Sequence, residues 1–487
     1  MQILAVYPEE PELAVFEKMP PLGMLWVAGT LRRAGYEIEF LDQQIDERDP
    51  GAVAQEGCPR LLLLGGTSHS RFASFEAARR VKRTSPETRV VYGGPHASFT
   101  AEDTLTHVPE IDIIVHGEGE ETSAELAEWS IRGEGRWEDL EAIRGISYRL
   151  GGRIARTPPR PAIADLDALG PPDRSLVPMD RYRMQMDYLD LPGTSIMTAR
   201  GCPIMCSFCS AAAMFGKTYR ARDPQAVVDE VEELITRHRA KGIKIFDSTF
   251  TLNRHHVERF CDELQRRGIR VPWECEIRVG SVDRPLLEKM REAGCYYVDV
   301  GVESGSQRVL DECVRKRISI AKAEELLRWT REMGLLTKVF FTSGHPGETY
   351  AEGRETLRFI RRNRRSIRLQ AYQAGIKIYP GTYVEEFARE HDLLPDGFRW
   401  SAPYENRDNR ALMRAVDNVP LLLQPGLGLA ELRRLRLQFI AMRIASVRFV
   451  LEKLKAIVRS RAFFDYLRIV SRGAKDKPRG RRGSRLG

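Results

Sequence analysis

Short apolar runs alternate with amphipathic segments over the first 130 residues. Leu22–Ala34 repeats apolar residues at spacings of three and four and precedes Gly35, which predicts a helix that ends there. Phe72–Arg83 has the same period and predicts a second helix. Strands that alternate with helices in this way predict an α/β domain with a parallel, doubly wound, Rossmann-like sheet. The expected strands are Met1–Tyr7, Glu37–Asp42, Arg60–Gly65, Arg89–Gly93 and Asp112–His116.

A second strand–helix series begins at Thr194. Six repeats predict a partial version of the parallel α/β barrel, a (βα)6 unit whose chemistry gathers at the C-terminal mouth. The expected strands are Ser195–Ala199, Ile243–Asp247, Trp273–Val279, Tyr296–Val302, Thr337–Thr342 and Ala371–Tyr379, and the expected helices are Gln225–Ala240, His255–Arg267, Arg284–Ala293, Ala321–Met333 and Tyr350–Arg362.

These patterns divide the chain into four parts. Residues 1–135 form the doubly wound domain, and residues 191–383 form the partial barrel. Between them, residues 136–190 are rich in Pro, Gly, Asp and Arg, which indicates a linker that crosses from one domain to the other. Residues 384–487 form a helical C-terminal region with a basic, disordered tail.

Composition is that of a soluble globular protein, with 42% hydrophobic and 30% charged residues. No run of eighteen apolar residues occurs, and Met1–Pro8 lacks the basic start of a signal peptide, so we expect a cytoplasmic protein. The net charge of +8 comes from the tail, because residues 431–487 hold 17 Lys and Arg against 4 Asp and Glu. With no recognition motif, this charge does not indicate nucleic-acid binding.

Phe439–Ile469 repeats apolar residues at helical spacing with Lys and Arg between them. One interpretation is a helix that caps the barrel. The other is a helix that lies on an anionic membrane as a peripheral contact, where each basic residue adds about 1 kcal/mol.

Glycine-bearing turns follow the N-terminal strands at Gly65–Ser68, Gly93–His96 and Gly117–Gly119. Ligands of open α/β sheets bind beyond the carboxyl ends of the strands, and glycine lets the backbone approach a bulky ligand. Tight turns alone are the alternative interpretation, but three such turns in one sheet favour a ligand.

Three cysteines, Cys202, Cys206 and Cys209, follow the first barrel strand with the spacing C-x3-C-x2-C. Three is an odd number for disulfides, and structural zinc usually has four ligands. An iron–sulfur cluster with three thiolate ligands and one open iron fits better. The remaining cysteines are expected to be buried thiols: Cys58, Cys261, Cys275, Cys295 and Cys313.

This spacing, with Phe208 before the last cysteine, resembles the radical S-adenosylmethionine (SAM) enzymes. The resemblance implies a [4Fe–4S] cluster whose open iron binds SAM, with Phe208 near the adenine. It also implies SAM contacts at the strand ends, including Glu303 in GVESG and Pro346 in GHPGE. Alternation places Glu274, Glu276 and Arg278 on one face of the third strand, which in a barrel is expected to be the interior, and a structural Glu–Arg pair is the alternative. Asp247 is the expected acceptor for the SAM amine, although the family's usual Gly-Gly-Glu is absent.

The N-terminal motifs PPLGM, YGGPH and HGEGEE resemble the cobalamin-binding domain that precedes many such enzymes. The turn after the first strand lacks the His that ligates cobalt in D-x-H-x-x-G proteins, so no His ligand from that loop is expected. Thr67–Arg71 is expected to form the floor under cobalt, where His69 either reaches the metal or only hydrogen-bonds. The expected cobalamin contacts are Pro8, Leu22, Gly23, Gly66, Thr67, Ser68, His69, Gly93, Gly94, Pro95, His96, Gly117 and Glu118.

The resemblance implies cleavage of SAM to a 5′-deoxyadenosyl radical and methyl transfer from methylcobalamin to an unactivated carbon. It implies a small-molecule, lipid-like or tetrapyrrole substrate and a flavodoxin or ferredoxin as reductant. A cyclase without net methylation uses the same cofactors and remains open. A methylthiotransferase needs a further cysteine cluster, and Cys58 stands alone in the N-terminal domain. A non-enzymatic cobalamin sensor leaves the cysteine triplet unexplained.

Overall fold

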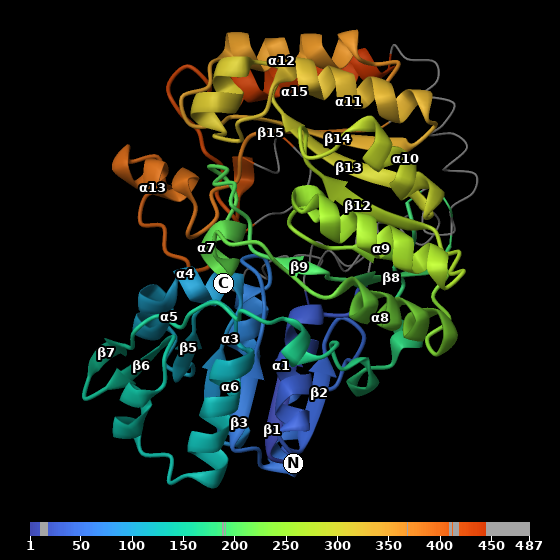
Figure 1. The fold of residues 1–487 in the computed structure, drawn as a ribbon. Coiled ribbons are helices and arrows are strands. Elements are labelled where there is room, and N and C mark those ends of the chain that lie inside the picture. Colours follow the sequence, from blue (N-terminus) through green and yellow to red (C-terminus); the bar gives the residue numbers. More distant parts are fainter. Residues whose placement is uncertain are drawn as a thin grey trace, which may run out of the picture. The chain divides into compact units, whose positions relative to one another are not determined.

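The computed structural model describes residues 1–9, 18–187, 189, 191–367, 369–408, 412 and 418–444. The chain forms two compact units, residues 1–436 and residues 437–487. The seven-stranded and six-stranded sheets and a two-stranded ladder all lie in the first unit (Figure 1). Most of the expected amphipathic segment Phe439–Ile469, and all of the expected basic tail, lie outside the described residues.

The N-terminal sheet is doubly wound, with the strand order β2-β1-β3-β4-β5-β6-β7. Its first five strands are parallel, and apolar side chains on both faces pack under the helices. The strands are β1 (Ile3–Tyr7), β2 (Ile38–Asp42), β3 (Leu61–Leu64), β4 (Arg89–Tyr92) and β5 (Ile113–Val115), and the helices are α1 (Leu22–Arg33), α2 (Pro50–Gly57), α3 (Arg71–Thr84), α4 (Pro95–Phe99), α5 (Ala101–His107) and α6 (Glu120–Ala127).

The sheet continues beyond residue 135. Strands β6 (Ile146–Leu150) and β7 (Arg153–Arg156) form an antiparallel hairpin on β5, inside the segment that composition indicates as a linker. β7 is an edge strand whose side chains are mostly exposed, so it needs few apolar residues. An Arg-rich strand without hydrophobic alternation gives no strand pattern, which is why the sequence alone did not predict this extension.

The second sheet has six parallel strands in the order β15-β14-β13-β12-β11-β8. Helices lie along its outer side, as in an opened α/β barrel (Figure 1). The strands are β8 (Gly193–Ile196), β11 (Gly242–Ile245), β12 (Trp273–Ile277), β13 (Cys295–Glu303), β14 (Leu336–Ser343) and β15 (Leu369–Ala374), and the helices are α8 (Pro224–Thr236), α9 (Arg254–Arg266), α10 (Arg284–Glu292), α11 (Ile320–Glu332), α12 (Tyr350–Arg362) and α13 (Tyr383–Glu390).

Side-chain caps fix where the barrel helices begin. Asp223, Asn253 and Asp283 each accept a hydrogen bond from a backbone N–H of the helix they precede. Thr349 and Glu352 form a reciprocal capping box at the start of α12. Because local sequence sets these boundaries, Tyr350–Arg362 agrees with the predicted helix at both ends.

The C-terminal region begins with α13 and includes α15 (Leu429–Ile444). Within the first unit, Leu435 of α15 lies against Gly353 of α12, where a Cβ would come within 2.5 Å of the leucine. Among the described residues, no helix has both the length and the apolar character to cross a membrane.

Candidate cofactor sites in the barrel and the N-terminal sheet

The three cysteines lie in a loop that leaves the end of β8. A two-stranded antiparallel ladder, β9 (Ala199–Arg200) with β10 (Arg220–Ala221), closes this loop at its base. Gly201 has a φ of +86°, and a Cβ there would lie 2.0 Å from the carbonyl oxygen of Thr218. Glycine is therefore required immediately before Cys202 for the loop to close.

All three thiols are free, and Cys202 and Cys209 lie close enough to Cys206 to raise its pKa. Burial and the neighbouring thiols raise the pKa of Cys206 to about 12, while Lys316 acts in the opposite direction. Burial also raises the pKa of Cys209, and the Ala211 N–H, 3.5 Å from its sulfur, opposes this shift. A cluster that binds thiolates supplies the positive charge that such thiols need to ionise.

Within the described part of the chain, no three His, Cys, Asp or Glu side chains converge as ligands of one metal ion. The ligands of a [4Fe–4S] cluster bind different irons, so they do not need to meet at one point. The geometry of the thiols therefore fits a cluster better than a mononuclear zinc site.

Lys316 lies beside the thiols and pairs with Glu303 at 2.8 Å. Burial disfavours the charged form of Lys316, but Glu303 and Cys206 outweigh this effect and raise its pKa. A Cβ on Gly301 would come within 2.4 Å of both members of the pair, so a bare backbone makes room for it. Sequence patterns did not predict Lys316, because its loop carries no motif.

Two predicted SAM contacts lie on or next to β12. Arg278 donates to the carbonyl oxygens of Lys316 and Arg317, at 2.8 and 3.1 Å, and so holds the loop that carries the lysine. Glu276 is exposed to solvent although protein surrounds it, as expected for a side chain that lines an open barrel. Among the described residues, neither forms the Glu–Arg pair considered as the alternative.

Asp247 is buried beneath the start of the cysteine loop. Its carboxylate accepts hydrogen bonds from the backbone N–H groups of Thr198 and Ala199, at 2.6 and 3.0 Å, and from the Thr198 hydroxyl. Burial raises its pKa to about 6, although these hydrogen bonds oppose the shift. All of these bonds are to the protein, so the geometry favours a positioning role over direct contact with the SAM amine.

Phe208 packs against the ring of His345, with centroids 5.7 Å apart, and against apolar residues beyond β13 and β15. The loop that carries His345 and Pro346 is ordered by Glu348, which accepts from the N–H groups of Gly344 and His345 at 2.7 and 3.0 Å. Phe208 thus joins the cysteine loop to this strand end, whatever it contacts in a bound SAM.

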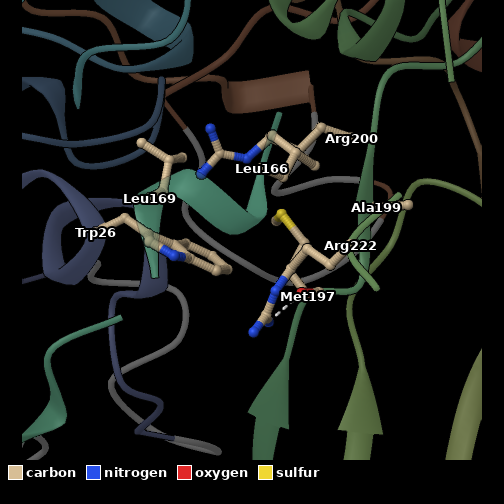
Figure 2. Close-up of a pocket in the computed structure, with 7 residues that line it drawn as sticks. All are labelled: Trp26, Leu166, Leu169, Met197, Ala199, Arg200 and Arg222. Atoms are coloured by element: carbon tan, nitrogen blue, oxygen red, sulfur yellow. Dashed lines mark hydrogen bonds between the residues drawn. The ribbon is translucent and has the colours of Figure 1, made fainter. Parts of the chain in front are cut away.

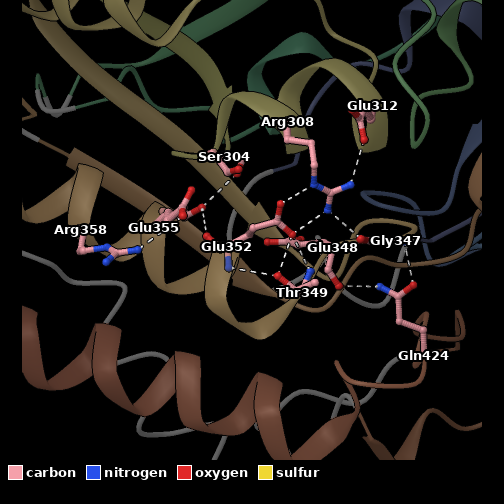
Figure 3. A network of polar contacts seen from close by, with 12 residues as sticks. Ser304, Arg308, Glu312, Gly347, Glu348, Thr349, Glu352, Glu355, Arg358 and Gln424 are labelled. Atoms are coloured by element: carbon pink, nitrogen blue, oxygen red, sulfur yellow. Dashed lines mark hydrogen bonds and ion pairs between the residues drawn. The ribbon is translucent and has the colours of Figure 1, made fainter.

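The same loop is tied to its surroundings by a polar network (Figure 3). Gln424 accepts from the Gly347 N–H at 2.9 Å and donates to the His345 carbonyl oxygen at 2.7 Å. Arg308 donates to Glu352 and to the Gly347 carbonyl oxygen. These bonds hold the mouth of the barrel at the end of β14 without using any residue of the cysteine loop.

At the carboxyl ends of the N-terminal strands, two glycine turns meet. A Cβ on Gly94, whose φ is +99°, would lie 2.9 Å from the carbonyl oxygen of Gly66. Gly66 has a φ of +146°, and its Cβ would lie 2.9 Å from the hydroxyls of Ser70 and Ser74. A large planar ligand such as a corrin needs close access to the backbone. Glycines at adjacent strand ends provide this access because they have no side chains.

The predicted floor of the site is held from several sides. His69 Nε2 lies 2.8 Å from the Tyr379 hydroxyl, which favours the interpretation that His69 is hydrogen-bonded. His96 is fully buried, with Nδ1 3.0 Å from the Ser68 hydroxyl and its ring against Trp400. His96 therefore supports the floor from below.

The other predicted cobalamin contacts differ in exposure. Gly23 and Pro95 are exposed, and nothing lies within 4 Å of a Cβ on Gly23. Leu22 packs in a small apolar cluster with Trp26. Intermediate or buried positions are taken by Pro8, Thr67, Gly93 and Gly117.

The C-terminal region also reaches this floor, which the sequence did not predict. Arg71 donates to the Trp400 carbonyl oxygen at 2.9 Å and to that of Asn418 at 2.6 Å, and Asn418 donates to the His69 carbonyl oxygen at 2.8 Å. Ser401 donates to Asp103. No motif marks these residues, because their role depends on contacts between distant parts of the chain.

Glu118 lies in a buried ion-pair network with two arginines of the cysteine-loop ladder. It accepts from Arg200 at 2.9 Å and from Arg220 at 2.9 Å, and from the Ile163 N–H at 2.8 Å. Glu120 pairs with Arg200 at 2.6 Å. The predicted cobalamin contact at Glu118 is therefore directed toward the barrel, and its carboxylate is occupied by protein groups.

Next to this network is a narrow pocket between α1 and the β8–β10 segment (Figure 2). Arg200 lies over the Trp26 ring at 5.0 Å, and Arg222 donates to the Met197 carbonyl oxygen at 3.1 Å. The pocket leaves no room for a water molecule, so α1 and the β8–β10 segment are closely packed there. Its other lining residues are Leu166, Leu169 and Ala199.

Two family models match the chain in the predicted order. The B12 binding domain matches residues 13–127, and the radical SAM superfamily matches residues 196–360. The first range covers the glycine turns, and the second begins at the end of β8 and includes the cysteine loop. The cysteine loop and the glycine turns thus provide binding groups suited to a [4Fe–4S] cluster with SAM and to cobalamin.

Known proteins resemble most of the chain. An uncharacterized methyltransferase of Pyrococcus horikoshii is 30% identical over 403 residues, which cover 81% of this chain and 84% of the relative. The anaerobic magnesium-protoporphyrin IX monomethyl ester cyclase of Cereibacter sphaeroides is 31% identical over 347 residues, covering 70% of this chain and 56% of the relative.

A solved structure supports the fold. The radical SAM methyltransferase TsrM of Kitasatospora setae, with cobalamin and a [4Fe–4S] cluster bound, aligns with a TM-score of 0.64 and 22% identity, covering 80% of this chain and 76% of TsrM. Both domain models, the relatives and the fold agree. The chain belongs to the cobalamin-dependent radical SAM enzyme family.

Proposed function

We propose that the protein is a methyltransferase that acts on an unactivated carbon of a small molecule. When bound, the cluster supplies an electron for cleavage of SAM, and cobalamin supplies the methyl group. The observation that carries the proposal is the buried Glu118–Arg200 pair, which joins the cobalamin-binding sheet to the strand before Cys202. Two cofactor sites tied together in this way suit a reaction that uses both.

The residues of the chain have distinct roles in this proposal. Cys202, Cys206 and Cys209 bind the cluster, and Lys316 places a positive charge beside the thiolates. Asp247 holds the backbone that leads to the loop. The glycine turns give the corrin access to the backbone at Gly66 and Gly94.

SAM contacts stay a proposal for four residues, because Glu276, which was also expected to contact SAM, lines the barrel and is assigned to another ligand below. Glu303 and Arg278 lie at the mouth beside the Lys316 loop. The backbone around Pro346 and the ring of Phe208 border the same mouth. Their shared position at the strand ends agrees with where the chemistry of parallel α/β barrels gathers.

Product analysis tests the reaction type. The full chain is reconstituted anaerobically with iron, sulfide and cobalamin, and then incubated with SAM, reductant and a metabolite extract. Formation of S-adenosylhomocysteine together with 5′-deoxyadenosine supports methyl transfer. Consumption of a substrate with 5′-deoxyadenosine but without S-adenosylhomocysteine would exclude methylation.

That second outcome would support a cyclase or rearrangement without net methylation. The similarity to the cyclase of Cereibacter sphaeroides favours this alternative as the second candidate. The chain covers little more than half of that relative, so the relative's whole activity does not follow for this protein.

Two finer features belong to the same proposal. A flavodoxin or ferredoxin is the proposed reductant, since a low-potential cluster needs an external electron donor.

Peripheral contact with the inner face of a membrane through the basic C-terminal segment is tested by liposome flotation. Equal flotation of the full chain and of a form that ends near Gly428 would dismiss this contact.

A further inference from the structure

Among the described residues, the inner face of the barrel sheet is accessible in part, although Glu274 and Tyr297 on this face are buried. Along β14, Lys338, Phe340 and Thr342 are partly exposed, whereas the alternate residues Thr337, Val339, Phe341 and Ser343 are buried. Successive residues of a strand point to opposite faces, and the buried set faces the helices. The inner side chains of β14 are therefore partly accessible to solvent.

Two carboxylates stand side by side on this inner face. The register pairs Glu276 of β12 with Asp299 of β13, and Asp299 with Lys338 of β14. Paired residues of parallel strands point to the same side of the sheet. Glu276 is exposed to the interior, while Asp299 is 8% exposed.

Lys338, Lys244 and Tyr297 favour the ionised form of Asp299, but no direct ion pair holds either carboxylate within the part of the chain that the structure describes. Among the described residues, neither Glu276 nor Asp299 forms an ion pair, and Asp299 Oδ1 accepts no hydrogen bond. Two inner lysines form their direct ion pairs with other carboxylates, Lys244 with Glu274 at 3.0 Å and Lys316 with Glu303 at 2.8 Å. A buried carboxylate without a direct ion pair is costly, so Asp299 beside the accessible Glu276 is suited to a cation that arrives from outside.

Ionisation of the pair supports this view. Burial and the neighbouring Asp299 raise the pKa of Glu276 to about 7, and burial raises the pKa of Asp299 to about 6 although Lys338 and Lys244 oppose this shift. A cation that donates hydrogen bonds to both groups would remove the penalty, because an opposite charge favours the ionised form. An ammonium group has three donors for this purpose.

We propose that Glu276 and Asp299 form a subsite that binds the cationic nitrogen of the substrate inside the barrel. The substrate is accordingly a small molecule that carries an ammonium or guanidinium group, and not an uncharged lipid. This inference rests on the proposed function, in which the substrate reacts within the barrel. SAM also carries positive charge, so the experiment separates these two sources of cation.

The first measurement uses n-butylammonium as the probe and 1-butanol as the neutral match. Calorimetric titration of the full chain, reconstituted with cluster and cobalamin and loaded with SAM, compares wild type with Asp299→Asn and Glu276→Gln. Binding of n-butylammonium is expected to weaken at least tenfold in both variants. Neither the wild type nor the variants are expected to bind 1-butanol. Glu288→Gln, at an exposed position on α10, serves as the matched control and leaves binding unchanged.

No binding of n-butylammonium to the wild type, or equal binding in all variants, would overturn the subsite. The second measurement follows SAM itself through the electron paramagnetic resonance of the reduced cluster. Asp299→Asn is expected to leave SAM binding unchanged. If it weakens SAM binding tenfold, the pair binds SAM and the substrate assignment is overturned. Neither measurement needs turnover, so a negative binding result would overturn the subsite without bearing on methyl transfer. The S-adenosylhomocysteine assay tests methyl transfer separately.

Discussion

Glu118 and Arg200 form an ion pair of 2.9 Å in which both side chains are at least 95% buried. The glutamate follows β5 of the N-terminal sheet, and the arginine stands two residues before Cys202. Glu120 and Arg220 complete a quartet whose charges balance. The cofactor loops of the two sheets are thus connected through groups that water does not reach.

Removal of one charge from this quartet is expected to be costly. Glu118→Gln leaves two buried arginines with a single carboxylate, and breaking a buried pair in this way costs about 3–5 kcal/mol. Chemical denaturation should show a free energy of unfolding lower by that amount. Glu121→Gln, whose side chain is 52% exposed and pairs with Arg160, should cost about 0.5 kcal/mol. Equal losses in the two variants would contradict a special role for the quartet.

Each of the three cysteines is expected to be essential for the cluster. Cys202→Ser, Cys206→Ser and Cys209→Ser remove one thiolate ligand each, so iron and sulfide content after anaerobic reconstitution should fall to background. Visible absorption and elemental analysis measure this loss. Cys58→Ser is the control, since Cys58 is exposed at the end of α2 and is not the buried thiol that the sequence predicted. Retention of a full cluster in any of the three variants would rule out that residue as a ligand.

Lys316 is expected to raise the reduction potential of the cluster. Its positive charge lies near Cys206, and a nearby cation stabilises the more negative, reduced state. Lys316→Met should therefore shift the midpoint potential in the negative direction, and Lys316→Arg should largely restore it. Spectroelectrochemical titration measures the shift. The exposed Lys322→Met provides the comparison, and a shift of the same size there would argue against a local effect.

Gly94 is expected to be needed for cobalamin binding. Gly94→Ala places a Cβ 2.9 Å from the Gly66 carbonyl oxygen and separates the two glycine turns. Binding of hydroxocobalamin should weaken at least about tenfold, or by roughly 1.4 kcal/mol. Gly152→Ala in the β6–β7 turn has a similar positive φ, +78°, but nothing within 4 Å of its Cβ. Both variants carry backbone strain, so only the difference between them tests the contact.

Asp247 gives a pH dependence of stability with a definite sign. Its pKa in the folded state is about 6, above the ordinary value of 3.8, so the native state retains a proton that the unfolded state has lost. The associated stability is present below pH 3.8 and is lost as the pH rises through 6, which amounts to roughly 3 kcal/mol.

The Asp247→Asn side chain does not ionise, so the variant does not lose this stability as the pH rises. The stability of the variant relative to wild type should therefore increase between pH 4 and pH 7, as measured by denaturation at each pH. Asp229→Asn, at a 66% exposed position, should give a profile parallel to that of wild type. A parallel profile for Asp247→Asn would contradict the raised pKa.

The sequence by itself determined the architecture and located the three cysteines proposed as cluster ligands. Hydrophobic periodicity and capping residues are local, so both strand–helix series follow from the chain order, and Tyr350–Arg362 agrees residue for residue. The three cysteines could be located for the same reason, because a single loop carries all of them.

The tertiary structure decided which side chains meet. Lys316 reaches the thiols, Glu118 pairs with Arg200, and Asp247 holds the loop backbone through contacts between segments far apart in the sequence. Glu276 and Asp299 become neighbours only through the register of β12 and β13. A buried charge takes whichever partner the packed chain brings within a few ångströms, and sequence spacing does not encode that distance.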